Sequence, residues 1–207
     1  AHPAPHTHDR QEFAPAPHAH AHGHHSLKEI AASIGRSALS PAGRKKAIEL
    51  FERLAEAEAA IHAMPVERVH LHEVGALDSI IDIVGAVYGM EWLAADAVVA
   101  SPLNVGSGTV VCAHGTFPVP APATARLLQG APVYAGPVAA EMVTPTGALI
   151  VTGYAAAYGP LPQMRLDRIG YGAGSRDFKG HPNVLRLMLG EAAAEADAER
   201  IVSIESE

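Results

Sequence analysis

Helix and strand patterns alternate along most of this chain, and this alternation limits its fold more than any other feature. Ser40 and Pro41 form a typical helix start, and the apolar spacing that follows predicts a helix ending at about His62. Further helices are expected at Ser26 to Gly35, Ala76 to Leu93, Ala123 to Leu128 and Thr146 to Tyr158, and strands at Val98 to Leu103, Thr109 to Ala113, Val133 to Tyr134, Arg165 to Tyr171 and Asn183 to Leu189. The sequence therefore favours an α/β or mixed α+β layered domain.

The two ends of the chain differ in composition from the part between them. Residues 1–25 hold mainly Pro, Ala and eight of the thirteen histidines, so they have too little to bury and are expected to be disordered. Residues 191–207 carry six acidic residues and one Arg, which favours a solvated acidic tail. We therefore expect three parts: a disordered segment at 1–25, a folded domain at 26–190 and a tail at 191–207.

Charge and cysteine content exclude several classes of function. The net charge of −7 divides into −1 for residues 1–25, −1 for 26–190 and −5 for 191–207, so no basic face invites nucleic acid. The single cysteine excludes an internal disulfide and a thiolate-rich zinc site, and it fits a reducing cytoplasm. No apolar run approaches the roughly 18 residues of a membrane-spanning helix.

The segment from His70 to Asp82 places two imidazoles and three carboxylates at a predicted strand-to-helix turn. If residues 69–72 form a strand, His70 and His72 point to the same face. Asp78 and Asp82 lie four residues apart on the following helix, which is apolar nearly all round and is expected to be central. Because a buried carboxylate is costly unless it is paired or coordinated, Asp82 needs a partner. Imidazole and carboxylate together are typical ligands of a divalent transition metal.

We therefore predict that His70 and His72 are metal ligands and that Asp78 and Asp82 are catalytic or supporting carboxylates. Glu73 is a further candidate, although a continuing strand would turn it to the opposite face. Two alternatives remain open. In the first, His70 and His72 are ordinary half-exposed strand residues. In the second, Asp78 bonds backbone amides near the helix start, where Asp is favoured.

Cys112 and His114 form a second pair of candidate ligands, two residues apart on a predicted strand. Zinc, nickel or copper could use a thiol and an imidazole, and a Cys–His nucleophile is a further interpretation. The alternative is a small buried cysteine beside a loop histidine.

Two motifs could hold a phosphate. Thr144 and Thr146 lie at a predicted helix start. Helix capping by Thr144 or Thr146 would explain one of the two hydroxyls, whereas an anion such as phosphate bound at the same amides would use both. Residues 169–177 form a Gly-rich loop in which Gly172 and Gly174 would form a backbone nest and Arg176 would face a phosphate. No helix pattern follows this loop, so it is not a dinucleotide-binding fingerprint.

The histidines near the N-terminus are candidate ligands of a different kind. They are interleaved with Ala, Pro and Gly, which argues against an expression tag. Flexible histidines bind nickel, copper or zinc loosely, so delivery or buffering of metal is the natural use. The candidate ligands in this tract are His18, His20, His22, His24 and His25.

From about Lys46 to Glu191 the chain resembles the nickel-insertion proteins that complete the nickel-pincer cofactor of lactate racemase. The matching stretches are Val69–Ala86, Cys112–Gly115, Pro118–Thr124, Glu141–Ala148 and Ile169–Gly174. Several separate motifs in the same order make the resemblance more specific than any one of them. The histidine-rich segment ahead of the long helix is similar to that of the family as well.

The resemblance implies a CTP-dependent enzyme of the metal-chelatase (lyase) type. Nickel would enter pyridinium-3,5-bisthiocarboxylic acid mononucleotide, assisted by a divalent ion such as manganese or magnesium, and apo lactate racemase would receive the product. Members of this family carry a C-terminal CTP-binding domain and begin with an Asp- and Gly-containing loop after a strand. Neither is found here, so we expect an N-terminal portion that does not turn over alone. The sequence leaves open whether it forms a homo-oligomer.

Two other functions use the same ligands. One is a non-catalytic nickel carrier or store. The other is a metal-dependent hydrolase in which His70, His72 and Asp78 surround a metal with an open position.

Overall fold

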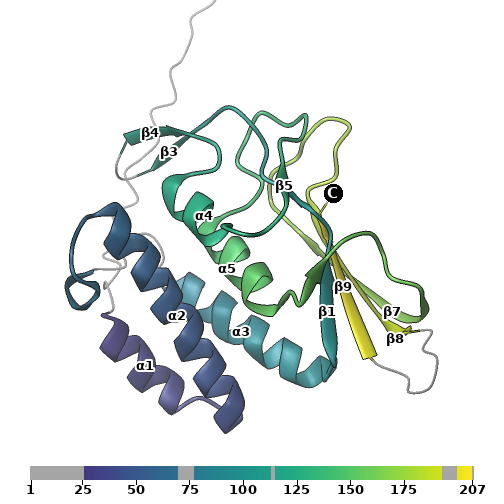
Figure 1. Cartoon of the computed structure of the whole chain (residues 1–207), viewed down its shortest axis with the longest axis horizontal. Helices are drawn as coiled ribbons and strands as arrows, with labels where there is room; N and C mark the ends of the chain where they lie inside the picture. The colour runs from purple at the N-terminus through teal and green to yellow at the C-terminus, as the bar shows by residue number, and fades with distance from the viewer. Residues whose placement is uncertain (1–25, 70–76, 113–114, 193–199, 207) are drawn as a thin grey trace, which may run out of the picture.

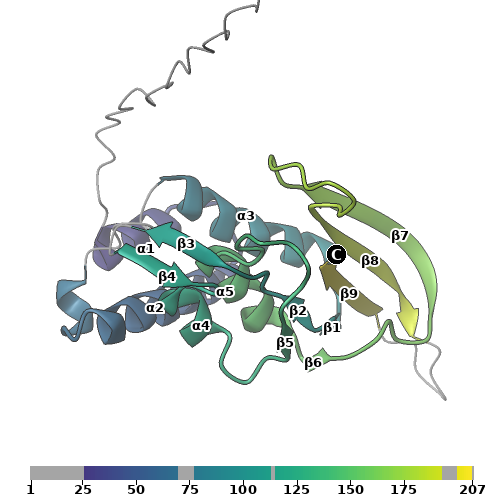
Figure 2. The same cartoon turned by 90° about the horizontal axis from the view of Figure 1, so that it is seen from above.

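The computed structural model describes residues 26–69, 77–112, 115–192 and 200–206. Its main sheet has five strands in the order β6-β1-β9-β8-β7, and the helices lie together on one side of this sheet (Figures 1 and 2). Two small two-stranded sheets, β2-β5 and β3-β4, lie beside the helices. The prediction of a layered domain that mixes helices and strands is confirmed. In the described part of the chain, no helix is both long and apolar enough to cross a membrane.

The first two helices lie within one residue of their predicted bounds. Helix α1, Leu27–Gly35, starts at Ser26, which forms a reciprocal capping box with Glu29. Helix α2, Pro41–Ile61, has Ser40 as its N-cap, and the Ser40 hydroxyl accepts a hydrogen bond of 3.0 Å from the amide of Gly43. Helix α2 packs against α1, α3, α4 and α5, so it is the central helix of the layer.

Helix α3, Leu77–Leu93, is less buried than its composition predicts. Ile83 and Val87 are fully buried in the core. The opposite face carries exposed apolar side chains: Leu77, Ile81, Tyr88 and Trp92. The expectation that this helix is central is therefore wrong, because α2 occupies the centre of the layer and α3 covers one side of it.

Helices α4, Pro122–Leu127, and α5, Pro145–Tyr154, complete the helical layer. The predicted helix from Thr146 to Tyr158 ends four residues early. Its last residues form β6, Ala157–Tyr158, which pairs in parallel with β1, Ala97–Ala100. The amides of Ala156 and Gly159 donate to the carbonyls of Val98 and Ala100 in β1, so pairing at the sheet edge replaces the last helical turn.

The remaining strands are β2 Leu103–Asn104, β3 Thr109–Cys112, β4 Gly115–Pro118, β5 Val133–Tyr134, β7 Met164–Ala173, β8 Val184–Ala192 and β9 Arg200–Ser206. The single strand predicted from Val98 to Leu103 is divided into β1 and β2, which belong to different sheets. Pro102, which has no amide hydrogen, lies between them.

Strand β9 corrects the expectation of a solvated acidic tail. It lies between β1, to which it is parallel, and β8, to which it is antiparallel. Val202 is 1% exposed and Ile204 is 5% exposed. Val202 and Ile204 point to one face of the strand and Ile201 points to the other, and the burial of all three outweighs the acidic composition.

Candidate functional site

The predicted site residues fall into two groups. His70, His72, Glu73, His114 and the five tract histidines at positions 18, 20, 22, 24 and 25 lie outside the described residues. The structure places the other candidates, which are Asp78, Asp82, Cys112, Thr144, Thr146, Gly172, Gly174 and Arg176. The site must therefore be built from the second group and from the described residues around it.

Cys112 ends β3 and is partly buried beside the C-terminal end of α2. It lines a small cavity of about 30 Å³ together with Glu58 and Ile61 of α2, Phe117 of β4, residues 121–123 at the start of α4, and Pro145. Figure 1 shows the β3–β4 hairpin above this end of α2. The cavity thus brings three separate sequence motifs together: Cys112, the Pro-rich stretch from Pro118 to Thr124, and the start of α5.

Glu58 is a member of this cavity that the sequence analysis missed. It is 9% exposed, and its carboxylate lies 3.6 Å from the imidazole Nε2 of His62, one helical turn later. The buried face of α2 includes Phe51, Leu54 and Ala55, and a helix of 3.6 residues per turn brings Glu58 onto the same face. That periodicity was the available signal, because it placed a carboxylate in an apolar stripe.

Asp78 and Asp82 are both exposed on the first turns of α3. The Asp78 carboxylate accepts a hydrogen bond of 2.8 Å from the amide of Ser79, in agreement with the alternative in which it bonds a backbone amide at the helix start. The prediction that burial forces Asp82 to have a partner is wrong, because an exposed carboxylate is solvated by water. In the described ranges, no three His, Cys, Asp or Glu side chains are grouped closely enough to hold a metal ion.

The start of α5 is capped by one of its two threonines. The Thr144 hydroxyl accepts a hydrogen bond of 3.2 Å from the amide of Gly147, which is the capping role expected for one hydroxyl. Thr146 lies in the first turn and is partly buried. Pro145 lies between them and also lines the Cys112 cavity, so this helix start and the thiol are neighbours.

Gly172 and Gly174 line a second cavity, of about 180 Å³, with Asn104, Met142 and residues 183–185. The expectation of a loop is wrong for Gly172, which is in strand β7 opposite Leu185, because β7 pairs with β8 along its whole length. Gly174 follows the strand, and its amide donates a 2.9 Å hydrogen bond to the carbonyl of Asn183. Arg176 is exposed, two residues further on.

Asn104 fixes the other wall of this second cavity. Its side-chain oxygen accepts hydrogen bonds from the amides of Gly106 at 3.0 Å and Gly136 at 2.9 Å, so one buried amide holds two loops. Gly106 has a φ of +82°, and a Cβ there would lie against the carbonyl of Ala140. Met142 lines this cavity and Pro145 lines the first, so the segment Glu141–Gly147 connects the two.

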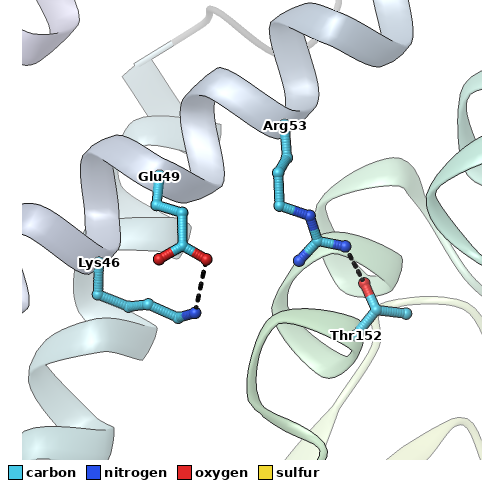
Figure 3. A network of polar contacts seen from close by, with 4 residues as sticks. All are labelled: Lys46, Glu49, Arg53 and Thr152. Atoms are coloured by element: carbon cyan, nitrogen blue, oxygen red, sulfur yellow. Dashed lines mark hydrogen bonds and ion pairs between the residues drawn. The ribbon is translucent and has the colours of Figure 1, made fainter.

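A larger cavity, of about 330 Å³, lies at the opposite end of α2; its lining is mainly apolar but includes Lys46, Glu91 and Tyr154. Figure 3 shows the polar contacts along α2 here: Lys46 pairs with Glu49 at 3.0 Å, and Arg53 donates to the Thr152 hydroxyl at 3.0 Å. Burial, followed by the charges of Glu91 and Glu49, raises the pKa of Tyr154 to about 12. This cavity has no counterpart among the predicted motifs.

Comparison with known proteins gives a consistent result. The model of a family described as "Nickel insertion protein" matches residues 7–207. A "Pyridinium-3,5-bisthiocarboxylic acid mononucleotide nickel insertion protein" from Desulfitobacterium hafniense is 54% identical over 172 residues, which are 83% of this chain and 42% of that protein. A "Putative nickel insertion protein" from Geotalea daltonii is 51% identical over 183 residues, 88% of this chain and 47% of that protein.

A third relative, from Geobacillus kaustophilus, has the same printed name as the Desulfitobacterium protein. It is 49% identical over 168 residues, which are 81% of this chain and 41% of that protein. This chain therefore spans less than half the length of the curated relatives it matches. No solved structure matches it.

Proposed function

Because this chain belongs to the nickel insertion protein family, we propose that it is the nickel-handling and precursor-binding part of a protein that inserts nickel into pyridinium-3,5-bisthiocarboxylic acid mononucleotide. The observation that carries this proposal is the 54% identity over 83% of the chain to a relative of that name. The reaction class would be that of a metal chelatase, and nickel is the substrate rather than a resident cofactor.

The convergence of motifs at the end of α2 supports this proposal. Cys112 and Pro145, at the start of α5, line the same small cavity, so a soft metal ligand lies close to a helix N-terminus, a kind of site that suits a phosphate. The precursor named above is a mononucleotide with two thiocarboxylic acid groups, so it would bring both phosphate and sulfur. We propose that its phosphate lies at Thr144 and Thr146, with Gly172, Gly174 and Arg176 as further contacts.

Nickel would be held by His70, His72, Cys112 and His114 and delivered by the tract that includes His18, His20, His22, His24 and His25. Formation of a metal–carbon bond requires removal of a proton from the ring, and a carboxylate or a neutral imidazole could accept it. Glu73, Asp78 and Asp82 are the proposed acceptors, or the oxygen ligands of an assisting manganese or magnesium ion. The carboxylates of Asp78 and Asp82 are exposed, which leaves them accessible to either.

CTP, its binding domain and apo lactate racemase as recipient belong to this proposal as parts of the whole reaction, in the cytoplasm. In this division of labour, the present chain binds nickel and the precursor, and the CTP-binding domain activates or positions the reacting groups. The chain alone should then bind nickel without hydrolysing CTP.

The test is reconstitution. The chain is mixed with the remaining C-terminal portion of a full-length relative, the precursor, nickel and CTP, and the product is followed by mass spectrometry and by activation of apo lactate racemase. CTP-dependent appearance of the nickel cofactor supports the proposal. If the pair takes up nickel but never forms the cofactor, the chain is a nickel carrier instead.

A further inference from the structure

We propose that the outer face of α3 is a self-association surface, on which α3 of a second copy of this chain packs in antiparallel orientation about a two-fold axis. This inference does not depend on the proposed function. The side chains of this face take no part in the nickel and phosphate contacts proposed above, apart from Asp78 and Asp82 at its edge.

The first observation is an apolar stripe on α3 that is left in solvent. Its side chains are between 58% and 68% exposed, and they are Leu77, Ile81, Tyr88 and Trp92. Their spacing puts them on one face of the helix, opposite the face that packs into the core. Exposed apolar side chains in a row, rather than singly, are typical of a contact surface.

The stripe borders an apolar groove of about 400 Å³ between α3 and the C-terminal end of α1. On α3 this groove is lined by Ile80, Ile81, Val84, Gly85 and Tyr88. It is large enough for an aromatic side chain. The surface therefore has both projecting side chains and a hollow that can receive them.

The stripe is symmetric along the helix. Leu77 and Trp92 are equally far from a point just before Gly85. Ile81 and Tyr88 are equally far from the same point. Two antiparallel copies that cross at this point therefore bring each aliphatic side chain of one copy against an aromatic side chain of the other.

The crossing point carries no side chain. A Cβ at Gly85 would meet nothing within 4 Å, and the same is true of Gly89, one turn later. Packing inside the chain therefore does not require a glycine at either position, although glycine destabilises a helix relative to alanine. The close approach of a second helix would give these glycines a role.

The charges at the edge of the stripe are complementary between its two ends. Asp78 and Asp82 lie on one flank, near the start of α3. Leu93 lies on the same flank three turns after Asp82, and it lines a cavity with Arg168 of β7. The Arg168 guanidinium lies over the ring of Trp92, 5.9 Å from its centroid. This flank is thus acidic at one end and basic at the other.

This arrangement favours a second copy as the occupant. In an antiparallel two-fold pair, the same flank of both helices faces the same way, so the acidic end of each copy meets the partner's Arg168. These charges lie at the edge of the contact, where water still reaches them. The segment 1–25 is a poorer occupant, because Phe13 is its only large apolar residue.

Trp92 is the single tryptophan of the chain and lies in the proposed contact, so its fluorescence reports on association. The full chain is studied by sedimentation velocity over a range of concentrations, in EDTA so that metal cannot bridge the histidines. A single helix face is a small interface, so we expect a dimer that dissociates on dilution through the micromolar range. The emission of Trp92 should shift to shorter wavelength as the dimer forms.

Substitutions test the contact and its orientation. Ile81→Glu places a charge in the stripe and should raise the dissociation constant at least about tenfold. Arg168→Glu should also weaken the dimer, and adding Asp82→Arg to it should restore association by reversing both charges. Leu161→Glu changes an apolar side chain that is 47% exposed and lies outside the stripe, and it should leave the dissociation constant unchanged.

Three outcomes would overturn the inference. The first is a chain that stays monomeric at every concentration; emission of Trp92 already at short wavelength in that monomer would show that another segment of the chain covers the face. The second is a dimer that Ile81→Glu leaves intact, because the contact then lies elsewhere. The third is a loss in Arg168→Glu that Asp82→Arg does not reverse, because the helices then do not pair antiparallel. Circular dichroism checks that each variant folds, and the charge reversal decides the test if Ile81→Glu does not.

Discussion

At the scale of single residues, the structure changes which carboxylate is buried. Asp82 interrupts an apolar helix and was expected to be buried, yet it is exposed. Glu58 lies in an Ala-rich helix among other charged residues, yet it is buried beside Cys112. A carboxylate in water needs no partner, whereas a buried one does. Glu58 therefore has a structural constraint that Asp82 lacks.

This difference predicts how Asp82→Asn behaves. Because Asp82 is exposed, the substitution should change the free energy of unfolding by less than about 0.5 kcal/mol. If the carboxylate accepts a proton or holds the assisting ion, the variant should lose cofactor formation while it keeps nickel uptake. Reconstitution assays and nickel titration measure the two effects, with Glu52→Gln as an exposed control on α2. Equal loss of both activities would contradict the proposed role.

Tyr154 gives a prediction about pH. Its pKa is raised from its ordinary value of 10.0 to about 12, first by burial and then by the charges of Glu91 and Glu49. The folded protein therefore holds the phenol proton more tightly than the unfolded chain does. Stability should be unaffected below about pH 10 and should fall as the pH rises from about 10 to about 12.

The measurement is chemical denaturation across this alkaline range. Tyr154→Phe cannot ionise at this position, so its stability should fall less steeply than that of the wild type. Tyr171→Phe, at a position that is 66% exposed, is the matched control and should keep the wild-type slope. Identical slopes in all three proteins would show that Tyr154 ionises alike in the folded and unfolded states.

At the scale of elements, β9 is the strand on which the sheet depends. It joins β1, from the first half of the chain, to the β7–β8 hairpin. Without it, the hairpin would have no hydrogen-bonded connection to the parallel strands of the main sheet. A segment with an acidic composition therefore fills the middle of the sheet.

The role of β9 predicts a large effect of Ile204→Ala. Ile204 is 5% exposed, and its truncation should lower the free energy of unfolding by about 2 to 5 kcal/mol. Ile169→Ala, in strand β7 of the same sheet, changes the same side chain at a position that is 51% exposed, and it should cost far less. Urea denaturation measures both variants. A solvated tail would instead make Ile204→Ala the milder of the two.

At the scale of the whole molecule, the fold gathers motifs that are far apart in the sequence. Cys112 and Pro145 line one cavity at the C-terminal end of α2. Met142, three residues before Pro145, lines the second cavity together with Gly172 and Gly174. The central position of α2 makes this possible, because β3, α4 and α5 all reach its C-terminal end. Cys112, Gly172 and Gly174 thus line two cavities that the segment Glu141–Gly147 connects.

The histidine tract leads to a prediction for the chain as a whole. Removal of residues 1–25 should lower the number of loosely bound nickel ions and leave the melting temperature unchanged, because the segment has few apolar side chains to bury. Calorimetric nickel titration and thermal melts of the two proteins measure these effects. Equal nickel stoichiometry in both would contradict the proposed delivery role.

The sequence by itself determined the features that depend on neighbouring residues. Ser40 caps the helix that it was expected to cap, and Thr144 takes the capping role that was expected of either Thr144 or Thr146, because each hydroxyl accepts a hydrogen bond from an amide three residues away. The order and spacing of the motifs also sufficed to indicate the family.

Only the tertiary structure decided which faces are buried and which strands pair. The place of β9 depends on β1, about 100 residues earlier. The exposure of Asp82 depends on α2, rather than α3, lying at the centre of the helical layer. Caps and turns are fixed by hydrogen bonds within a few residues, whereas burial and strand order are fixed by contacts between distant segments, which local sequence patterns do not encode.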